Sequence, residues 1–507
     1  MIFQITRLLL AATILSAAAA QTAPAPYNEP FRPQVHFSPR ERWMNDPNGL
    51  VFFEGEYHLF FQHNPLGDTP GHISWGHAVS TDLLHWHELP VAIPATDKEL
   101  VFTGSVVVDE KNSSHQCENH QPCLVAIYTA HNDTPHHEAQ ALAVSQDRGR
   151  TWKRFSGNPV LDRNVPEFRD PGVTWNDETK SWLMVVSLPN DHKVVFYTSP
   201  DLIEWTELST FGPAATVSGQ WECPNLLKIP TADGKQSLYA LKIGVNPGSL
   251  QGGSGEQYFL GTFDGHHFTQ SSDPGSHGWT DYGKDSYCAI SFNHLPAGEP
   301  PTLIGWMDDW QYADKLPTVP WRGQMTIPRH LALLKDADGL ALQQTPVTAP
   351  IRAKSTSLVA SITQPTTTLF TTDQPTELTL TIDPADAQTF GLRLYSDPAH
   401  WTEVAIDRTT MKLSTDRTHA TNITAPDFPA RTEAPLSPNR PLDLHLILDR
   451  SSVEVFAQNG TTAMTNLTMP TTQNLRVELF RTQGTHPLKV IGQRWTLRSV
   501  WSSAQAK

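Results

Sequence analysis

The stretch Ser80-Thr81-Asp82-Leu83-Leu84-His85-Trp86 decides the fold, because the chain repeats it several times. Related stretches occupy residues 145–152 and 199–205, and a weaker copy occupies residues 262–268. The aspartates of successive copies are 65, 54 and 63 residues apart. Each copy has the composition of a strand end, a tight turn that begins at the aspartate, and an aromatic residue that opens the next strand. A repeat of roughly 60 residues with about four short strands is the size of one blade of a β-propeller.

The repeats lie within a series of short β-type runs that extends from Arg42 to about Arg329. The stretch Glu54-Gly55-Glu56 predicts a hairpin turn, because a short β-type run lies on each side of it. Helical periodicity is scarce throughout this region. Dividing roughly 290 residues by the repeat length gives five blades. The sequence therefore predicts a five-bladed β-propeller over residues 34–342.

A second domain follows the repeats. Residues 343–357 contain Pro346 and Pro350 among alanines and threonines, which is a composition typical of a linker. Beyond this segment, apolar and polar residues alternate more strictly, which favours a two-sheet β-sandwich over residues 358–507. The predicted fold class is all-β: a five-bladed β-propeller followed by a C-terminal β-sandwich.

The balance of charged residues limits the kinds of molecule that the chain is expected to bind. The 507-residue chain has 37 Lys and Arg against 52 Asp and Glu, a net charge of −15. This balance argues against nucleic acid, whose binding requires a basic patch, and against an anionic membrane surface. A neutral substrate is the simpler interpretation.

The N-terminus has the features of a secretory signal peptide over residues 1–20. Arg7 is followed by 13 mostly apolar residues, Leu8 to Ala20, which are too few to span a bilayer. The prediction is a secreted protein, extracellular or periplasmic. In such an oxidising compartment, Cys117 and Cys123 could close a small disulfide, whereas Cys223 and Cys288 are isolated in the sequence.

Three acidic motifs stand out in the first domain: Trp43–Gly49, Glu167–Gly172 and Trp221–Pro224. Each also has a plain structural interpretation, as a turn, a local salt bridge or a structural Glu paired with an Arg. The Trp and Cys beside Glu222, however, suggest an acid shielded from water, as a general acid requires. Two carboxyls in different environments are the equipment for glycoside hydrolysis, and loops of separate blades can bring them together.

Other chemistries fit less well. His85 and His87 lie on one face of a strand, but no third metal ligand occurs at a credible spacing. The glycines of residues 252–255 lack the lysine and the strand–helix context of a phosphate loop. Neither group of residues therefore predicts a metal site or a phosphate loop.

The chain resembles glycoside hydrolase family 32, which contains invertases, inulinases and levanases. Seven motifs match it in the family's order, and an eighth stretch, Leu448–Phe456, resembles its C-terminal sandwich. The seven are Trp43–Gly49, Phe60–Gln62, Ser74–Ala78, Phe102–Ser105, Arg169–Pro171, Glu222–Pro224 and Gly305–Met307. The resemblance covers nearly everything from Phe37 onward and implies the propeller-and-sandwich fold.

The resemblance also implies a retaining mechanism, and it implies no metal ion and no organic cofactor. Asp46 would be the nucleophile, Glu222 the acid and base, and Asp170 the residue that holds fructose hydroxyls. A retaining pair predicts carboxyl groups about 5 to 5.5 Å apart. The residues expected to bind substrate are Trp43, Asn45, Gln62, Trp75, Phe102, Thr103, Arg169 and Trp306.

The implied activity is the release of terminal fructose from levan, inulin or sucrose. Asp308 and Asp309 depart from the Asn expected in many relatives, and Asn225 follows the Glu222 motif at a variable position, so chain-length preference stays open. A fructosyltransferase with the same machinery is an alternative. A non-catalytic fructan-binding protein, or an arabinan- or xylan-acting enzyme, fits less well, because all three acids and the Trp43–Gly49 motif are present. The sequence indicates no oligomeric state.

Overall fold

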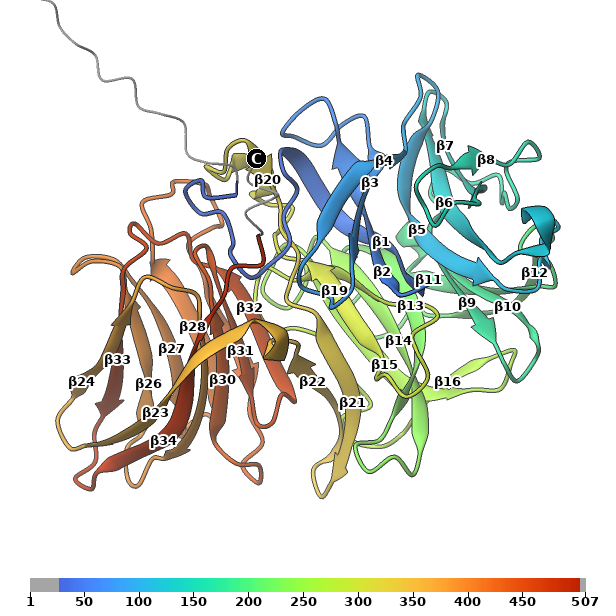
Figure 1. Cartoon of the computed structure of the whole chain (residues 1–507). Coiled ribbons are helices and arrows are strands. Elements are labelled where there is room, and N and C mark those ends of the chain that lie inside the picture. The colour runs from blue at the N-terminus through green and yellow to red at the C-terminus, as the bar shows by residue number, and fades with distance from the viewer. Residues whose placement is uncertain (1–26, 502–507) are drawn as a thin grey trace, which may run out of the picture.

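The computed structural model describes residues 27–501, in which strands make up nearly all of the regular structure (Figure 1). The helical elements of this part are short 3-10 turns: η1 (Glu118–His120), η2 (Pro189–Asp191), η3 (Ala313–Lys315) and η4 (Ala349–Ile351). The predicted all-β class is confirmed. The predicted signal peptide lies outside the described residues. Within them, no helix is both long enough and apolar enough to traverse a bilayer.

The described residues between 42 and 346 form five sheets, in which neighbouring strands run antiparallel except at β20. The first contains β1 (Arg42–Phe53), β2 (Glu56–Asn64), β3 (Ser74–Ser80), β4 (His87–Ile93) and β20 (Trp321–Arg322). The second contains β5 (Leu100–Asp109), β6 (Cys123–Asp133), β7 (His136–Ser145) and β8 (Lys153–Arg154). The third contains β9 (Arg169–Asn176), β10 (Ser181–Leu188), β11 (Lys193–Ser199) and β12 (Thr206–Phe211).

The fourth and fifth sheets complete this part of the chain. The fourth contains β13 (Gln220–Pro230), β14 (Ser237–Asn246), β15 (Gly255–Phe263), β16 (Phe268–Gln270) and β17 (His277–Trp279). The fifth contains β18 (Tyr287–Ser291), β19 (Thr302–Trp306), β21 (Arg329–Asp336) and β22 (Gly339–Pro346). The first strands of successive sheets contact one another, β1 with β5, β5 with β9, β9 with β13 and β13 with β18. Because β18 also contacts β1, these first strands close a ring.

The repeated aspartates make the turns between the third and fourth strands of four sheets. The Asp82 carboxylate accepts hydrogen bonds from the backbone N–H groups of Leu84 and His85, at 3.1 and 2.8 Å. Asp147, Asp201 and Asp264 accept equivalent bonds in the β7–β8, β11–β12 and β15–β16 turns. The repeat is thus a turn that the side chain itself stabilises, which is why the sequence displays it so clearly.

The described residues beyond 351 form two sheets of six strands each, drawn in orange to red in Figure 1. One has the order β23 (Arg352–Ile362), β34 (Leu488–Leu497), β25 (Thr376–Asp383), β30 (Asp443–Leu448), β31 (Ser452–Ala457), β32 (Thr462–Leu467). The other has the order β24 (Thr366–Thr372), β33 (Leu475–Thr482), β26 (Thr389–Tyr395), β27 (Trp401–Asp407), β28 (Lys412–His419), β29 (Arg431–Pro435). A single apolar cluster draws residues from both sheets, among them Leu378, Leu392, Val404 and Val455, so the sheets pack face to face.

The segment 343–357, which the sequence predicts as a linker, is mostly strand. Its first residues end β22 and its last residues belong to β23, so only residues 347–351 lie between the strands. Pro346 is tolerated because it is the last residue of β22, and Pro350 because it lies in η4.

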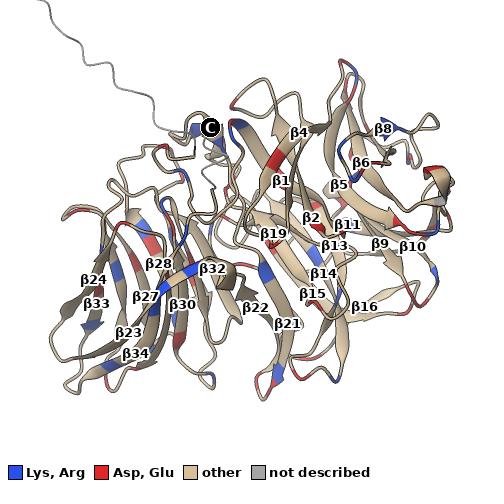
Figure 2. Cartoon of the chain, viewed as in Figure 1, with Lys and Arg blue, Asp and Glu red and all other residues tan. Residues whose placement is uncertain are grey.

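Buried ion pairs join the two parts of the chain. Arg329 on β21 donates to Asp281 at 2.9 Å and to Glu454 on β31 at 2.5 Å, and all three side chains are at most 2% exposed. His36 contacts Asp449 and Glu454, at 2.8 Å each. Elsewhere, acidic and basic segments are intermingled over both parts, as Figure 2 shows.

Candidate active site

The first strand of each of the five sheets carries a β-bulge near its start. In each bulge, two residues of the first strand face one residue of the second. The bulged pairs are Asn45-Asp46, Phe102-Thr103, Asp170-Pro171, Cys223-Pro224 and Cys288-Ala289. Because a bulge re-aims side chains that regular pairing would send to alternate faces, these five pairs can turn toward the centre of the ring.

The bulges bring together the three acids that the sequence predicts. Asp46 and Asp170 are bulge residues, and Glu222 directly precedes the bulge of β13. Asp46 is 7% exposed and Asp170 is 5% exposed. Charge interactions couple the three acids, because Glu222 raises the pKa of both aspartates. Residues more than 170 positions apart in the sequence thus share one site.

A chain of hydrogen bonds fixes Asp46. The Trp43 indole donates to Asn45 Oδ1 at 2.7 Å, and Asn45 donates to Gln62 Oε1 at 3.1 Å. Gln62 in turn donates to Thr103, whose hydroxyl donates to Asp46 Oδ2 at 3.1 Å. Asp46 Oδ1 is buried and has no hydrogen-bond partner among the described residues. One oxygen of Asp46 is therefore held in place while the other is unpaired.

Burial dominates the electrostatics of this carboxyl. Burial, together with the charge of Glu222, raises the pKa of Asp46 to about 7. Burial also raises the pKa of Asp170 well above its ordinary range, although the adjacent Arg169 charge opposes the effect. The charge of each acid acts on its neighbours, so the titrations of Asp46 and Asp170 are coupled to the rest of the cluster.

Asp170 has a strained backbone, with φ at +66°, a region that non-glycine residues rarely adopt. Its N–H donates to Thr129 Oγ1 at 2.9 Å, and its Oδ2 accepts from the N–H of Cys223 at 2.9 Å. The second bond spans two sheets, so the side chain of Asp170 fixes the backbone beside Glu222.

Both oxygens of Glu222 are bound by donors. Arg169 donates to Oε1 through Nε at 3.1 Å and through Nη2 at 3.0 Å. Tyr287 donates its hydroxyl to Oε2. Burial and the Glu222 charge raise the pKa of Tyr287 well above its ordinary value, so it stays a donor. Tyr287 is not among the residues that the sequence predicts, because no local pattern marks it.

An apolar wall lies beside the acids. Trp43 and Trp306 are fully buried, with ring centroids 6.1 Å apart, and Trp310 lies 4.9 Å from Trp306. The Trp306 indole N–H is buried without a hydrogen-bond partner among the described residues. A disulfide between Cys223 and Cys288, which the sequence could not pair, belongs to the same cluster.

The remaining predicted residues lie as follows. Phe102 is half-buried and stacks on His131 at 4.2 Å. Trp75 is fully buried between the first two sheets and reaches the site only through its indole N–H, which donates to the Phe102 carbonyl at 2.9 Å. Cys117 and Cys123 are joined by a disulfide at the other end of β6.

The donor sets for a metal ion are poor. One group of close ligand atoms in the described part consists of Asp46 and two sulfurs that already form a disulfide. The other, His136 with Glu138 and Glu167, surrounds the guanidinium of Arg169, because both glutamates accept its Nη1.

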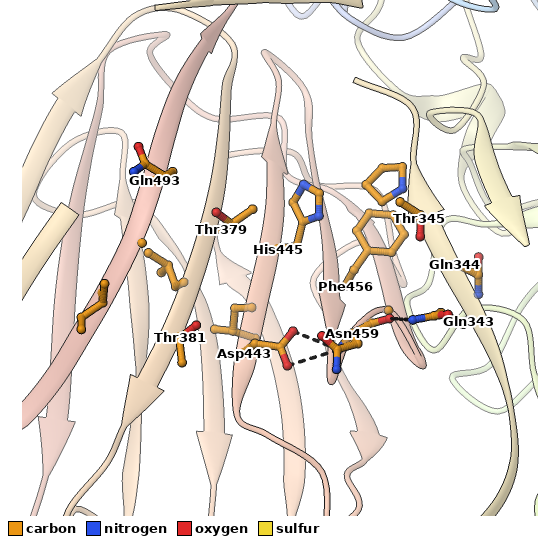
Figure 3. A pocket seen from close by; sticks show the side chains of 16 residues that line it. Gln343, Gln344, Thr345, Thr379, Thr381, Asp443, His445, Phe456, Asn459 and Gln493 are labelled. Atoms are coloured by element: carbon orange, nitrogen blue, oxygen red, sulfur yellow. Dashed lines mark hydrogen bonds between the residues drawn. The ribbon is translucent and has the colours of Figure 1, made fainter. Parts of the chain in front are cut away.

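A separate hollow of about 530 Å³ lies where β22 faces the outer side of β25, β30 and β34 (Figure 3). Asp443 is the one acid among the residues that line it, and both of its oxygens accept from the Asn459 N–H, at 3.2 and 3.0 Å. Glycoside hydrolysis uses a pair of carboxyls, so this hollow lacks the second acid that the centre of the ring provides.

Comparison with known proteins identifies the family of the chain. The model of the glycosyl hydrolases family 32 N-terminal domain matches residues 36–346, and that of the family's C-terminal domain matches residues 344–494. A levanase of Bacillus subtilis is 39% identical over 488 residues, which cover 92% of this chain and 71% of the levanase.

Solved structures are similar over almost the whole chain. The crystal structure of an exo-inulinase from Aspergillus awamori has a TM-score of 0.87 at 35% identity, covering 94% of this chain and all of that one. A β-fructofuranosidase from Schwanniomyces occidentalis, complexed with fructosyl-erythritol, has a TM-score of 0.83 at 30% identity, covering 94% and 98%.

Proposed function

The chain belongs to glycosyl hydrolase family 32, and on that premise we propose that it is a retaining glycosidase that releases terminal β-D-fructofuranosyl units from levan, inulin and sucrose. The observation that carries the proposal is the cluster of Asp46, Asp170 and Glu222 beside an apolar wall. Asp46 offers an unpaired oxygen there, and Glu222 is held by an arginine and a tyrosine.

In the first step, Asp46 Oδ1 attacks the anomeric carbon of fructose as the glycosidic carbon–oxygen bond breaks. Glu222 gives its proton to the departing oxygen, and a fructosyl ester forms on Asp46. In the second step, Glu222 removes a proton from water, the water oxygen bonds to the anomeric carbon, and Asp46 leaves. Asp170 would hold fructose hydroxyls and stabilise the positive charge of the transition state.

The remaining predicted residues take supporting roles in this proposal. Asn45, Gln62 and Thr103 position Asp46, while Trp43, Phe102 and Trp306 present the apolar wall to the sugar. The Trp306 indole N–H is available to a fructose hydroxyl. Trp75 would act by holding the Phe102 backbone.

The proposal extends to the architecture of the chain and to its cellular location. We infer that the five sheets are the blades of a propeller over residues 34–342 and that the two six-stranded sheets form a sandwich. The closed ring of first strands supports this inference. Two disulfides support a secreted protein whose residues 1–20 are a signal peptide.

A time-resolved product profile tests the function. The purified protein is incubated separately with levan, inulin and sucrose, and the products are chromatographed. Fructose as the first product from both polymers is expected. A ladder of oligosaccharides would mean endo cleavage, lengthened products from concentrated sucrose would mean transfer, and no product at all would contradict the proposal.

Two variants test the roles of the acids. Asp46→Ala removes the nucleophile and should abolish turnover, and Glu222→Ala should lower kcat by about 10² to 10⁴. Asp68→Ala is the control, because that carboxyl is 58% exposed. Near wild-type turnover in either of the first two, with an unchanged thermal melt, would overturn the mechanism.

A further inference from the structure

Arg169 is shared among three carboxylates. Besides its two bonds to Glu222, its Nη1 donates to both oxygens of Glu138 at 3.2 Å and to Glu167, and its Nη2 donates to Gln220 at 2.8 Å. The side chain of Arg169 is 9% exposed and that of Glu138 only 1%. A carboxylate so deeply buried needs full compensation, and its partners here include the arginine that holds Glu222.

Glu138 also holds the backbone that precedes this arginine. Its Oε2 accepts from the Phe168 N–H at 2.7 Å. From the same hairpin, Gln140 donates to the Phe168 carbonyl at 2.7 Å, and Thr129 accepts from the Asp170 N–H at 2.9 Å. The β6–β7 hairpin therefore fixes residues 168–170 from one side, and Glu138 is its charged contact.

His131 lies directly across from Glu138 in the β6–β7 pairing. Its Nδ1 is 3.1 Å from Glu138 Oε1 and its Nε2 is 3.0 Å from Asp133 Oδ1, so both ring nitrogens face carboxylates. Burial alone would lower the pKa of His131, but the hydrogen bonds that its ring donates to Glu138 and Asp133 raise it above the ordinary value. The His131 ring also stacks on Phe102, at an angle of 13° between the rings.

We propose that Glu138, supported by His131, is a positioning residue of the active site. It holds Arg169 against Glu222 and divides the charge of the guanidinium between Glu222 and itself. Through His131, the wall residue Phe102 joins the same unit. The proposal rests on the function proposed above and goes beyond it, because neither Glu138 nor His131 reaches the reacting atoms.

Several charged groups face this unit. Arg169 is met by Glu138 on β7, by Glu167 on the segment before β9 and by Glu222 on β13. Asp170 on its own strand adds a further negative charge, and Asp46 and Tyr287 act on Glu222 from β1 and β18. His136 contacts Glu167 at 3.1 Å. The variants below change only Glu138 and His131, neither of which is proposed to touch the substrate.

Two substitutions test the proposal, one that removes the carboxylate of Glu138 and one that removes the imidazole of His131. Glu138→Gln should lower kcat by about 10- to 100-fold, because Arg169 is displaced, with KM changed less than threefold. It should also move the alkaline limb of the kcat profile to lower pH, because one of the three carboxylates that share the Arg169 charge is lost and more of that charge then acts on Glu222. His131→Gln should move the same limb to higher pH, because Glu138 then competes more strongly for Arg169.

Glu99→Gln is the matched control, because Glu99 is a part-buried acid that pairs with Arg154 at 3.0 Å near the outer strand of the same sheet. Its pH profile should be that of the wild type. Shifts in the same direction for Glu138→Gln and His131→Gln, or a lower kcat with unmoved limbs, would reduce Glu138 to a structural residue and overturn the proposal.

A titration of the histidine rings by NMR gives a readout that needs no turnover. The His131 signal, assigned by its loss in His131→Gln, should titrate at lower pH in Glu138→Gln than in the wild type. An identical titration would overturn the proposal even if Glu138→Gln failed to reach full activity for other reasons. Failure of the proposed function is distinct, because it appears as no fructose release by the wild type.

Discussion

Asp46 is a residue whose chemistry conflicts with its surroundings. In the proposed role of nucleophile it has to be ionised, yet burial and the neighbouring Glu222 raise its pKa to about 7 from an unfolded value of 3.8. The native state therefore loses stability as the pH rises from about 3.8 to 7, because unfolding lets this carboxyl ionise in water. The site is held together at the expense of stability.

Asp46→Asn should therefore stabilise the protein while abolishing activity. At pH 7.5 the gain is on the order of a few kcal/mol, since one pKa unit corresponds to about 1.4 kcal/mol. Thermal melts across pH 3 to 8 check this: the variant should melt higher than the wild type at neutral pH, and the difference should vanish near pH 3. A variant that melts lower at neutral pH would contradict the argument.

At the scale of single residues, the sequence predicts those site residues that lie in recognisable short motifs. Asp46, Asp170 and Glu222 lie in short motifs, and the structure brings all three together. Tyr287, Glu138 and the pairing of Cys223 with Cys288 could not be predicted, because each depends on strands that are distant in the sequence. The location of Trp75 likewise follows from packing between two sheets.

The bulged first strand is the element that carries the site. In β5, the bulge residue Thr103 contacts Asp46, and the next residue, Gly104, lies against the backbone of β6. A Cβ at Gly104 would come within 2.2 Å of the Ile127 carbonyl oxygen, so the two strands would have to separate.

Gly104→Ala should therefore lower both stability and kcat, because the separation displaces Thr103 from Asp46. Gly261→Ala makes an equal clash, 2.1 Å from the Thr269 carbonyl oxygen, on strand β15, far from the bulges. It should lower the melting temperature similarly while the folded fraction keeps its kcat. Equal losses of kcat per folded molecule in the two variants would show that the bulge does not position Thr103.

Elements are predictable where side chains make them locally. The Asp82-type turns give the period of the sheets because the carboxylate itself binds the turn backbone. The bulges leave no such signal, since one skipped pairing is decided by the partner strand. Residues 343–357 show the converse, because proline content predicted a linker where strands continue up to Pro346.

For the whole molecule, the contact between the two parts depends on buried charge. His36, Asp449 and Glu454 are all fully buried, and the two carboxylates raise the pKa of His36 to about 9, although burial alone would lower it. A group whose pKa is raised on folding contributes its full stability below the unfolded pKa, about 6.5, and loses it as the pH approaches 9.

The melting temperature should consequently fall between pH 6.5 and 9. His36→Gln should melt lower at pH 6 and should lack most of this fall. His85→Gln is the control, because His85 pairs with Asp82 on the surface and its side chain is 45% exposed. Parallel curves for the wild type and His36→Gln would show that His36 does not set the pH dependence.

The five bulges are one backbone feature that holds different residues in different sheets. Two of them hold an aspartate, one holds Phe102 and Thr103, and two hold half-cystines, yet in each one two residues of the first strand face one residue of the second. The bulge therefore does not depend on an acid, and the ring has a bulge of this kind in each of its five first strands. A carboxylate placed at a different bulge of the ring would approach a bound sugar from a different side. The same backbone could then serve a glycosidic bond of a different orientation.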